Sequence, residues 1–394
     1  MQSIVLNVVA CLLKAGAAVF GLFPVRRRVV LMSRQSSKPS QDFCLLAEAL
    51  RKRFPYLEVQ MCVTEPEIKA KAQFAGNTVR QLKWARTSSV VVLDGYIPAV
   101  SVPKPRPGVT VIQLWHAMGA IKRFGYQCLD TPDGRSSTSA RVLRMHRNYD
   151  WIVVGGPWAV NDLAAAFDAP VEKVLPLGLP RLDYLCAPAF EGQRDEMRTR
   201  ILGEFPLLAN GRKNVVYAPT FRRNDFSFGM HELQQALEFV GDFPFNFVYA
   251  GHPLEDEGDP LCLPENTLAD TGFRTIDLLL VADCVITDYS AIAYEAAALG
   301  VPVFFSVSDI EEYRISPGLN VDPLADYPEC SFENLKRTLK RIKAYFGLNA
   351  CASCENAPTC SKRKPLPRTT FNESLGEFPT QCLDSIVDLI GENL

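Results

Sequence analysis

The stretch Val285-Ile286-Thr287-Asp288-Tyr289-Ser290-Ala291-Ile292-Ala293-Tyr294-Glu295, which continues to Gly300-Val301-Pro302-Val303, decides the fold of this chain. The apolar run before Thr287 predicts a buried strand, and Ser290 is a good N-cap for the alanine-rich helix that follows. Gly300 and Pro302 end that helix and lead into another strand. In open parallel sheets, a turn at the carboxyl end of a strand is where ligands bind. The N–H groups at the helix start suit a phosphate, although an ordinary turn without a ligand has the same pattern.

Strand-like and helix-like stretches alternate along the rest of the chain in two blocks. The apolar runs that predict buried strands lie at 29–33, 57–63, 90–93, 109–114 and 151–154 in the first block, and at 214–218, 245–250 and 284–286 in the second. A chain of 394 residues is long enough for two domains. We therefore predict an α/β fold of two Rossmann-like domains that face a cleft.

The composition also suggests where the parts of the chain begin and end. We expect an apolar leader (1–24), an N-terminal acceptor domain (25–190), a linker (191–212), a C-terminal nucleotide-donor domain (213–346), a Cys/Pro-rich insertion (347–380) and a C-terminal helix (381–394). The linker is inferred from its high charge and irregular pattern.

The leader is apolar from residue 4 to residue 23, apart from Asn7 and Lys14, and three arginines follow it at 26–28. The run is just long enough to span a bilayer, but it lacks the basic start and the cleavage site of a secretory signal. A helix that lies in the membrane interface explains Lys14 better than a span does, with the arginines on anionic headgroups. A helix packed on the protein body is the alternative without a membrane. Either membrane mode leaves the remainder of the chain on the cytoplasmic face.

The net charge of −2 hides an asymmetry between the two halves. Residues 1–200 carry 27 Lys and Arg against 16 Asp and Glu, whereas the remainder carries 15 against 28. The basic first half predicts an anionic partner, such as a phospholipid surface or a phosphate-bearing substrate. No nucleic-acid-binding motif accompanies the basic residues, so we expect no nucleic-acid partner.

The 12 cysteines are scattered, and several of them, such as Cys62 and Cys284, lie inside apolar runs. This pattern indicates buried thiols in a reducing compartment and not a disulfide framework. Cys351-x-x-Cys354, with Cys360, has the spacing of half a zinc site, but no matching second pair follows it. We therefore expect free thiols there and no metal.

Two of the four histidines, His116 and His252, directly follow predicted strands, one in each half. A parallel sheet displays its functional side chains at that edge, and imidazole is suited to proton transfer near neutral pH. Each of them alone is also compatible with a structural role. His146 and His231 are expected at the surface.

The motifs around these histidines resemble those of the CDP-glycerol glycerophosphotransferase family, whose members prime and polymerise teichoic acids. The resemblance covers residues 20–325 and rests on six motifs in the same order. They are Leu114-Trp115-His116-Ala117-Met118-Gly119, Gly178-Leu179-Pro180-Arg181-Leu182-Asp183, Tyr217-Ala218-Pro219-Thr220-Phe221-Arg222, His252-Pro253, Thr287-Asp288-Tyr289-Ser290 and Ile310-Glu311-Glu312-Tyr313-Arg314.

This resemblance implies a GT-B-like fold and an enzyme, without cofactor or metal, that moves glycerol phosphate from CDP-glycerol to a hydroxyl of a lipid-linked acceptor and releases CMP. It implies that His116 is the base and that His252 holds the donor phosphates with Thr220, Arg222 and Ser290. Further candidates for substrate binding are Asp288, Glu295, Lys122 and Arg314. Asp288 could instead cap the turn structurally, and Glu295 could instead be an exposed charge on the helix.

Three positions depart from the family pattern, in which Gly, Ser and Asp are usual where this chain has Ala117, Ala291 and Glu295. The last two changes leave the polyol of the donor open, so CDP-ribitol or a nucleotide sugar is an alternative donor. A catalytically inactive scaffold and a cytidine-phosphate sensor are alternatives from other classes. The presence of both His116 and His252 disfavours the scaffold.

Overall fold

The computed structural model describes residues 2–64, 71–222, 227–240, 244–251, 263–269, 271–348 and 368–394. The chain forms two compact units. Unit 1 contains residues 1–187, 315–320 and 378–394, and unit 2 contains residues 188–314 and 321–377. Each unit is built around its own six-stranded sheet, and all strand pairs in both sheets are parallel. The predicted α/β fold with two Rossmann-like domains is confirmed.

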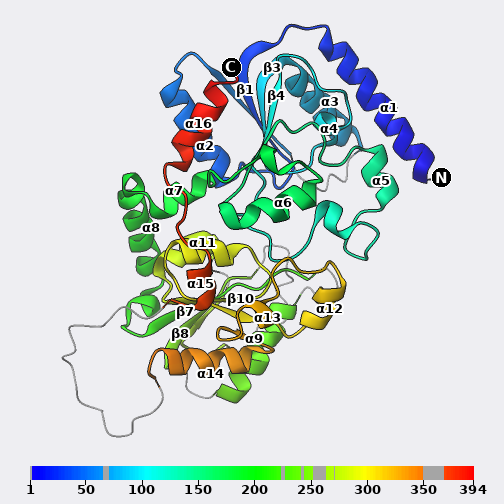
Figure 1. Ribbon diagram of the computed structural model, residues 1–394. Helices are drawn as coiled ribbons and strands as arrows, with labels where there is room; N and C mark the ends of the chain where they lie inside the picture. The colour runs from blue at the N-terminus through cyan, green and yellow to red at the C-terminus, as the bar shows by residue number, and fades with distance from the viewer. Residues whose placement is uncertain are drawn as a thin grey trace, which may run out of the picture. The chain divides into compact units, whose positions relative to one another are not determined.

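The sheet of unit 1 has the strand order β2-β1-β3-β4-β5-β6. Its strands are β1 (Arg26–Ser33), β2 (Glu58–Val63), β3 (Ser88–Leu93), β4 (Thr110–Gln113), β5 (Trp151–Val153) and β6 (Val174–Leu175). Its helices are α1 (Gln2–Gly21), α2 (Gln41–Arg53), α3 (Lys71–Thr87), α4 (Pro98–Ser101), α5 (Ser137–Val142), α6 (Val160–Phe167), α7 (Pro180–Cys186) and α16 (Cys382–Gly391). Strands β1 and β3 are buried over long apolar runs because helices cover both faces of a parallel sheet. Figure 1 shows α2, α7 and α16 on one side of this sheet and α1, α3 and α4 on the other.

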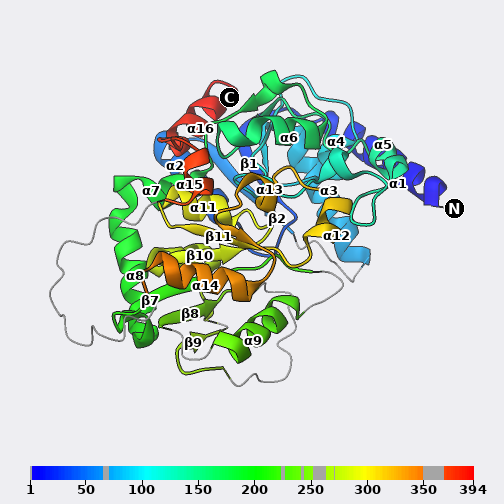
Figure 2. The ribbon, with the colours of Figure 1, turned by 60° about the horizontal axis from the view of Figure 1, so that its bottom comes forward.

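The sheet of unit 2 has the strand order β12-β11-β10-β7-β8-β9, most of which can be followed in Figure 2. Its strands are β7 (Lys213–Tyr217), β8 (Phe245–Tyr249), β9 (Thr267–Leu268), β10 (Cys284–Thr287), β11 (Val303–Ser306) and β12 (Ser331–Phe332). Its helices are α8 (Glu191–Glu204), α9 (Phe228–Val240), α10 (Thr275–Leu278), α11 (Ile292–Ala298), α12 (Ile310–Ile315), α13 (Pro323–Asp326), α14 (Leu335–Tyr345) and α15 (Thr370–Ser374). The order of strands reverses between β7 and β10, which places a topological switch point beside the stretch that decides the fold.

One of the expected boundaries is corrected by the structure. The expected linker at 191–212 contains the 14-residue helix α8, and this segment belongs to unit 2. Its charged residues form the solvated surface of a helix and not an irregular segment. The expected C-terminal helix is present as α16, which packs on α2 and α7 in unit 1. The Cys351, Cys354 and Cys360 cluster lies outside the described residues.

Helix α1 is long and apolar enough to cross a membrane by length and composition. One face of it is buried on the body of unit 1 through Ala10, Leu13 and Ala17, where it contacts α3, α4 and α5. A Cβ atom on Gly16 would lie only 2.9 Å from the Leu82 side chain, so this glycine allows a close approach of α1 to α3. The opposite face exposes large apolar side chains, among them Leu12, which is 67% exposed. Helix α1 therefore packs on the protein body through one face and leaves its other, apolar face uncovered.

Candidate functional site

One candidate site lies at the carboxyl ends of β3 and β4 in unit 1. His116 follows β4, and its Nδ1 atom is 2.9 Å from the backbone carbonyl oxygen of Asp94, which follows β3. A carbonyl oxygen only accepts, and this contact is shorter than the 3.3 Å contact of Nδ1 with the Gln35 amide nitrogen, so it favours the tautomer with the proton on Nδ1. Among the described residues no hydrogen bond engages Nε2, and the side chain is exposed to solvent. His116 therefore presents an unprotonated nitrogen that can accept a proton.

The backbone before His116 is held in an unusual conformation. Trp115 has a φ of 58°, in the left-handed region that non-glycine residues rarely adopt. Its N–H group donates to the Gln113 side chain, which itself donates to the carbonyl of Gly95. The Trp115 ring stacks on Phe124, with ring centroids 4.7 Å apart. These contacts fix the direction in which the strand end presents the imidazole.

The surroundings of His116 keep its ring neutral. Desolvation lowers the pKa of His116 to about 4, and the cations Arg181 and Lys122 act in the same direction, whereas the hydrogen bond with Asp94 opposes them. The side chain is exposed to solvent, which weakens desolvation, but the two cations still act to keep the pKa below its ordinary value of 6.5. Across this range the imidazole is predominantly neutral at pH 7.5, which is the form a general base needs.

An ion pair ties this strand end to α2 and α7. Arg181 donates to Asp42 from its backbone N–H (2.7 Å) and from its side-chain Nε (2.8 Å), and its guanidinium also reaches the carbonyl of His116 at 3.3 Å. The Asp42 carboxylate is almost fully buried. Two residues further on, the Asp183 carboxylate accepts a hydrogen bond from the N–H of Leu383 at the start of α16. The motif at 178–183 is thus architectural in unit 1.

Gly178, which opens this motif, has a φ of +80°. A Cβ atom at this position would lie 2.3 Å from the Cys382 sulfur, so any larger residue would displace α16. The glycine therefore allows the close contact with the C-terminal helix.

The side chain of Asp94, near His116, is a buried carboxyl group. It is 2% exposed, and neither carboxylate oxygen has a hydrogen-bond partner among the described residues. Desolvation raises the pKa of Asp94 to about 7, with Asp42 acting in the same direction and the nearby Ser33 and Arg181 opposing it. Close to neutral pH this carboxyl group is thus partly protonated.

A separate candidate site lies at the carboxyl ends of β7, β10 and β11 in unit 2. Asp288 accepts hydrogen bonds from the backbone N–H of Thr220 (2.8 Å), from its hydroxyl (2.6 Å) and from Arg222 (2.8 Å). Arg222 also donates to Asp309 at 2.8 Å and to the carbonyl of Thr220. Burial alone would lower the pKa of Arg222, but the carboxylates of Asp288 and Asp309 raise it. The structure therefore brings the predicted residues Thr220, Arg222 and Asp288 together.

Two tyrosines from separate motifs cover this ion-pair cluster. Tyr289 and Tyr313 stack with ring centroids 3.8 Å apart, and the Arg222 guanidinium lies 4.7 Å from the centre of the Tyr313 ring. The Phe228 ring lies 4.5 Å from the same guanidinium. Aromatic faces stabilise a cation in this position, and they shield it from water. The Arg222 side chain is only 9% exposed as a result.

Ser290 and Glu295 lie on the turn and the helix that follow Asp288. Helix α11 begins at Ile292, two residues after Ser290, and the Ser290 hydroxyl accepts only a long bond of 3.4 Å from the Ile292 N–H. The sequence placed this helix start too early because Ser is a common N-cap. Glu295 is 2% exposed, which excludes the alternative of an exposed helix charge.

The remaining candidates lie in different surroundings. Lys122 is close enough to His116 to affect its pKa. Arg314 forms ion pairs with Glu311 and, at 2.7 Å, with Asp322. His252 lies outside the described residues, so its expected position opposite His116 stays a prediction.

His146 was expected at the surface, but it is buried among aromatic rings, with the Phe167 ring centroid at 4.5 Å. Desolvation lowers the pKa of His146 to about 3. The arginines near it in the sequence favour exposure, but the side chain of His146 points into the aromatic cluster. His231 is exposed, as expected.

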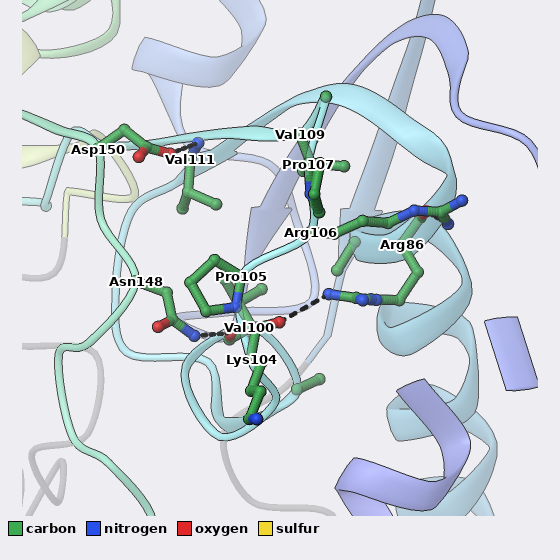
Figure 3. Close-up of a pocket in the computed structure, with 13 residues that line it drawn as sticks. Arg86, Val100, Lys104, Pro105, Arg106, Pro107, Val109, Val111, Asn148 and Asp150 are labelled. Atoms are coloured by element: carbon green, nitrogen blue, oxygen red, sulfur yellow. Dashed lines mark hydrogen bonds between the residues drawn. The ribbon is translucent and has the colours of Figure 1, made fainter. Parts of the chain in front are cut away.

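A pocket of about 340 Å³ at the other end of the unit 1 sheet is not part of this site (Figure 3). It lies at the amino end of β4, whereas His116 follows the carboxyl end of that strand. Its cations are used in protein contacts, since Arg86 donates to the carbonyl of Lys104 and Arg106 donates to that of Phe20. These bonds secure the loop after α4 and the end of α1.

The sequence reading assigned no role in the site to Asp94, Asp42 or Gln35, and it placed Arg181 only within a motif. Asp94 follows a buried apolar run just as His116 does, so the same strand-end rule could have identified it. Asp42 pairs with a residue 139 positions away, and no local pattern reports such a contact. Gln35 lies in a polar loop, and its amide nitrogen is 3.3 Å from the His116 Nδ1 atom.

Two parallel α/β units with polar strand ends define the GT-B-like class of proteins. The chain is similar in fold to the wall teichoic acid polymerase TagF, with a TM-score of 0.69 and 20% sequence identity over 98% of this chain and 95% of that chain. A more distant fold similarity is to UDP-GlcNAc 2-epimerase from Methanocaldococcus jannaschii, with a TM-score of 0.56 and 10% identity over 93% of this chain and 99% of that chain.

Sequence comparison is more specific. Residues 18–350 match the CDP-Glycerol:Poly(glycerophosphate) glycerophosphotransferase family, and the chain belongs to this family. It is 32% identical to the teichoic acid ribitol-phosphate primase of Bacillus spizizenii over 74% of this chain and 76% of that protein. It is 28% identical to the teichoic acid glycerol-phosphate primase of the same organism over 75% of each chain. The family resemblance that the six motifs indicated is thereby confirmed.

Proposed function

We propose that this chain transfers glycerol phosphate, or a related polyol phosphate, from a CDP-activated donor to a hydroxyl group of a lipid-linked acceptor. Membership of the family supports the general part of this proposal, that the chain is a polyol-phosphate transferase of teichoic acid synthesis. A related TagF structure was solved after a soak with CDPG, which supports a CDP-polyol as the donor class. The acceptor and the release of CMP are parts of the proposal.

The reaction needs a base and a way to accommodate negative charge. The acceptor hydroxyl gives its proton to a base while its oxygen forms a bond to the phosphorus that carries the polyol. The bond from that phosphorus to the bridging oxygen breaks, and CMP leaves with the electron pair. His116 carries this proposal, because Asp94 fixes the Nδ1 proton and leaves Nε2 unprotonated.

The cluster in unit 2 is proposed to shape the donor site. We expected Arg222 to contact the donor phosphates, but four of its hydrogen bonds go to protein oxygens. We therefore assign Arg222 a positioning role, in which it fixes Asp288 and the Thr220 turn. The N–H and hydroxyl of Thr220 likewise donate to Asp288, so Thr220 shares this positioning role. Ser290, His252 and Glu295 remain the proposed contacts to the donor.

Lys122 and Arg314 have weaker claims to a binding role. Lys122 lies near His116 and is proposed to stabilise the charge on the transferred phosphate. Arg314 is already neutralised by Glu311 and Asp322, so we assign it to the stabilisation of the loop after α12.

Membrane association through α1 is the proposed route to a lipid-linked acceptor. One face of α1 packs on unit 1, whereas the other exposes Ile4, Leu12 and Leu22. A helix held in this way suits a bilayer surface better than a span, because a span would have to leave the body of the protein. We propose that the enzyme is monotopic or peripheral on the cytoplasmic face of the cell membrane.

Ribitol phosphate is the second candidate for the transferred group, because a ribitol-phosphate primase is 32% identical to this chain. The decisive experiment measures CMP release by the purified full chain from CDP-glycerol and from CDP-ribitol, each with and without a lipid-linked acceptor. Release that depends on the acceptor with one donor supports the proposal and identifies the polyol. The absence of CMP release with every CDP donor would refute it and favour a scaffold.

A further inference from the structure

The carboxyl edge of the unit 1 sheet holds a second pocket that the reaction described above does not use. It has a volume of about 230 Å³. Its wall includes Arg34, Thr64 and Tyr96, which follow β1, β2 and β3. The pocket thus lies at the same sheet edge as His116. The residue after Arg34 is Gln35, whose amide contacts the His116 ring.

Two guanidinium groups line this pocket. Arg34 and Arg135 both line it, and neither forms an ion pair with a carboxylate of the described residues. Desolvation lowers the pKa of Arg34, and the charge of Arg135 lowers it further. The Arg135 guanidinium lies 5.5 Å from the centre of the Tyr96 ring, and both arginines act on the pKa of Tyr96. Two neighbouring cations that repel each other are stabilised when an anion binds between them.

Apolar side chains also line the pocket. They are Val9 and Leu13 of α1, Leu143, and Phe74 of α3, whose ring lies 6.0 Å from the Arg34 guanidinium. Phe74 is 48% exposed, and Val9 lies on the uncovered face of α1. The pocket therefore combines two cationic groups with apolar side chains. A ligand that fits both kinds of side chain carries a phosphate at one end and a hydrocarbon chain at the other.

We propose that Arg34 and Arg135 bind the phosphate or diphosphate through which the acceptor is attached to its lipid, while the first part of that lipid lies against Val9 and Leu13. The site deepens the proposed function, because it would hold the acceptor on the same sheet edge as His116. A free anionic headgroup of the bilayer has the same chemistry, and the experiment below separates the two sources.

The test uses the full-length protein and farnesyl diphosphate as the probe, measured by titration calorimetry below its critical micelle concentration. Each of Arg34→Gln and Arg135→Gln removes one charge-assisted contact, and we expect each to weaken binding about 10-fold or more. Farnesol and inorganic pyrophosphate, which each fit only one wall, should bind more weakly. Arg51→Gln on α2, which does not line the pocket, is the matched control and should bind as the wild type does.

Unchanged affinity in both arginine variants, with native tryptophan fluorescence, would overturn the proposal. Sedimentation with phosphatidylcholine vesicles, with and without phosphatidylglycerol, identifies the source of the phosphate. If the variants lose only phosphatidylglycerol-dependent sedimentation and still bind farnesyl diphosphate, the pair recognises the bilayer and the acceptor assignment is wrong. The calorimetric readout needs no donor and no turnover. Binding without CMP release would therefore refute the proposed function alone, and CMP release with unchanged probe affinity would refute this site alone.

Discussion

The buried carboxyl group of Asp94 gives the sharpest quantitative prediction. In the unfolded chain this group ionises near its ordinary pKa of 3.8, whereas in the folded protein it stays protonated until about pH 7. Because the folded-state pKa is raised, the stabilisation from Asp94 is complete below 3.8 and is lost as the pH rises through 7. The full shift corresponds to roughly 4 kcal/mol of unfolding free energy at alkaline pH.

Asp94→Asn removes this titration and keeps the backbone carbonyl that holds His116. The buried amide has its own constant desolvation penalty, so only the pH dependence of the difference between variant and wild type is diagnostic. Between pH 5 and pH 8.5 the variant should gain about 2–3 kcal/mol of unfolding free energy relative to the wild type. The gain should be concentrated below pH 7 and should flatten above pH 8.

Tryptophan fluorescence during urea unfolding is the appropriate assay. All four tryptophans of the chain lie in unit 1, so their signal reports the unit that contains Asp94. The exposed Glu48→Gln on α2 is the control for loss of a carboxylate from the same unit. A difference between Asp94→Asn and wild type that stays constant from pH 5 to 8.5 would refute the assignment of a raised pKa to Asp94.

Four further predictions test the site and the membrane helix. His116→Ala should lower the rate of CMP release by about 10²–10⁴-fold with unchanged tryptophan fluorescence, and a retained rate would remove His116 from the mechanism. In the wild type the acid limb of kcat/KM should lie below pH 6.5, because desolvation and the cations Arg181 and Lys122 lower the pKa of His116; a limb at or above 6.5 would contradict this. Arg222→Ala leaves the buried carboxylate of Asp288 and the half-buried one of Asp309 without a cation, so unit 2 should lose about 3–5 kcal/mol of unfolding free energy, seen by far-UV circular dichroism as a transition separate from that of the tryptophans. Removal of residues 1–24 should abolish sedimentation with anionic vesicles, and unchanged sedimentation would show that α1 is not the anchor.

Patterns that are local in sequence predicted much of this structure. Apolar runs bounded by polar residues identified the central strands of both sheets, because strands covered by helices on both faces must be apolar throughout. Polar residues directly after those runs identified His116 and Asp288, since the carboxyl ends of parallel strands meet at one edge. In the structure, the motif residues Thr220 and Arg222 both donate hydrogen bonds to Asp288.

Features that depend on contacts between distant segments could not be predicted. The pairing of Asp42 with Arg181 and of Asp183 with the start of α16 joins residues 139 and 200 positions apart. The burial of His146 depends on aromatic partners from other segments, and its basic neighbours pointed to the opposite conclusion. Segment 191–212 was judged by its charge, although a charged sequence can form a helix when one face meets the body of a domain.

The arginines of the two units separate into two functional groups by their partners. Arg181 and Arg222 are part of the family-like motifs, and both are used by buried carboxylates, Asp42 in unit 1 and Asp288 in unit 2. An arginine that is already neutralised gains little from a phosphate, because binding would have to displace a carboxylate in a site of low dielectric constant. Arg34 and Arg135 lie outside those motifs and have no such partner among the described residues. If this reasoning is right, substitution of the motif arginines should change stability first, whereas substitution of the other two should change ligand affinity with stability preserved.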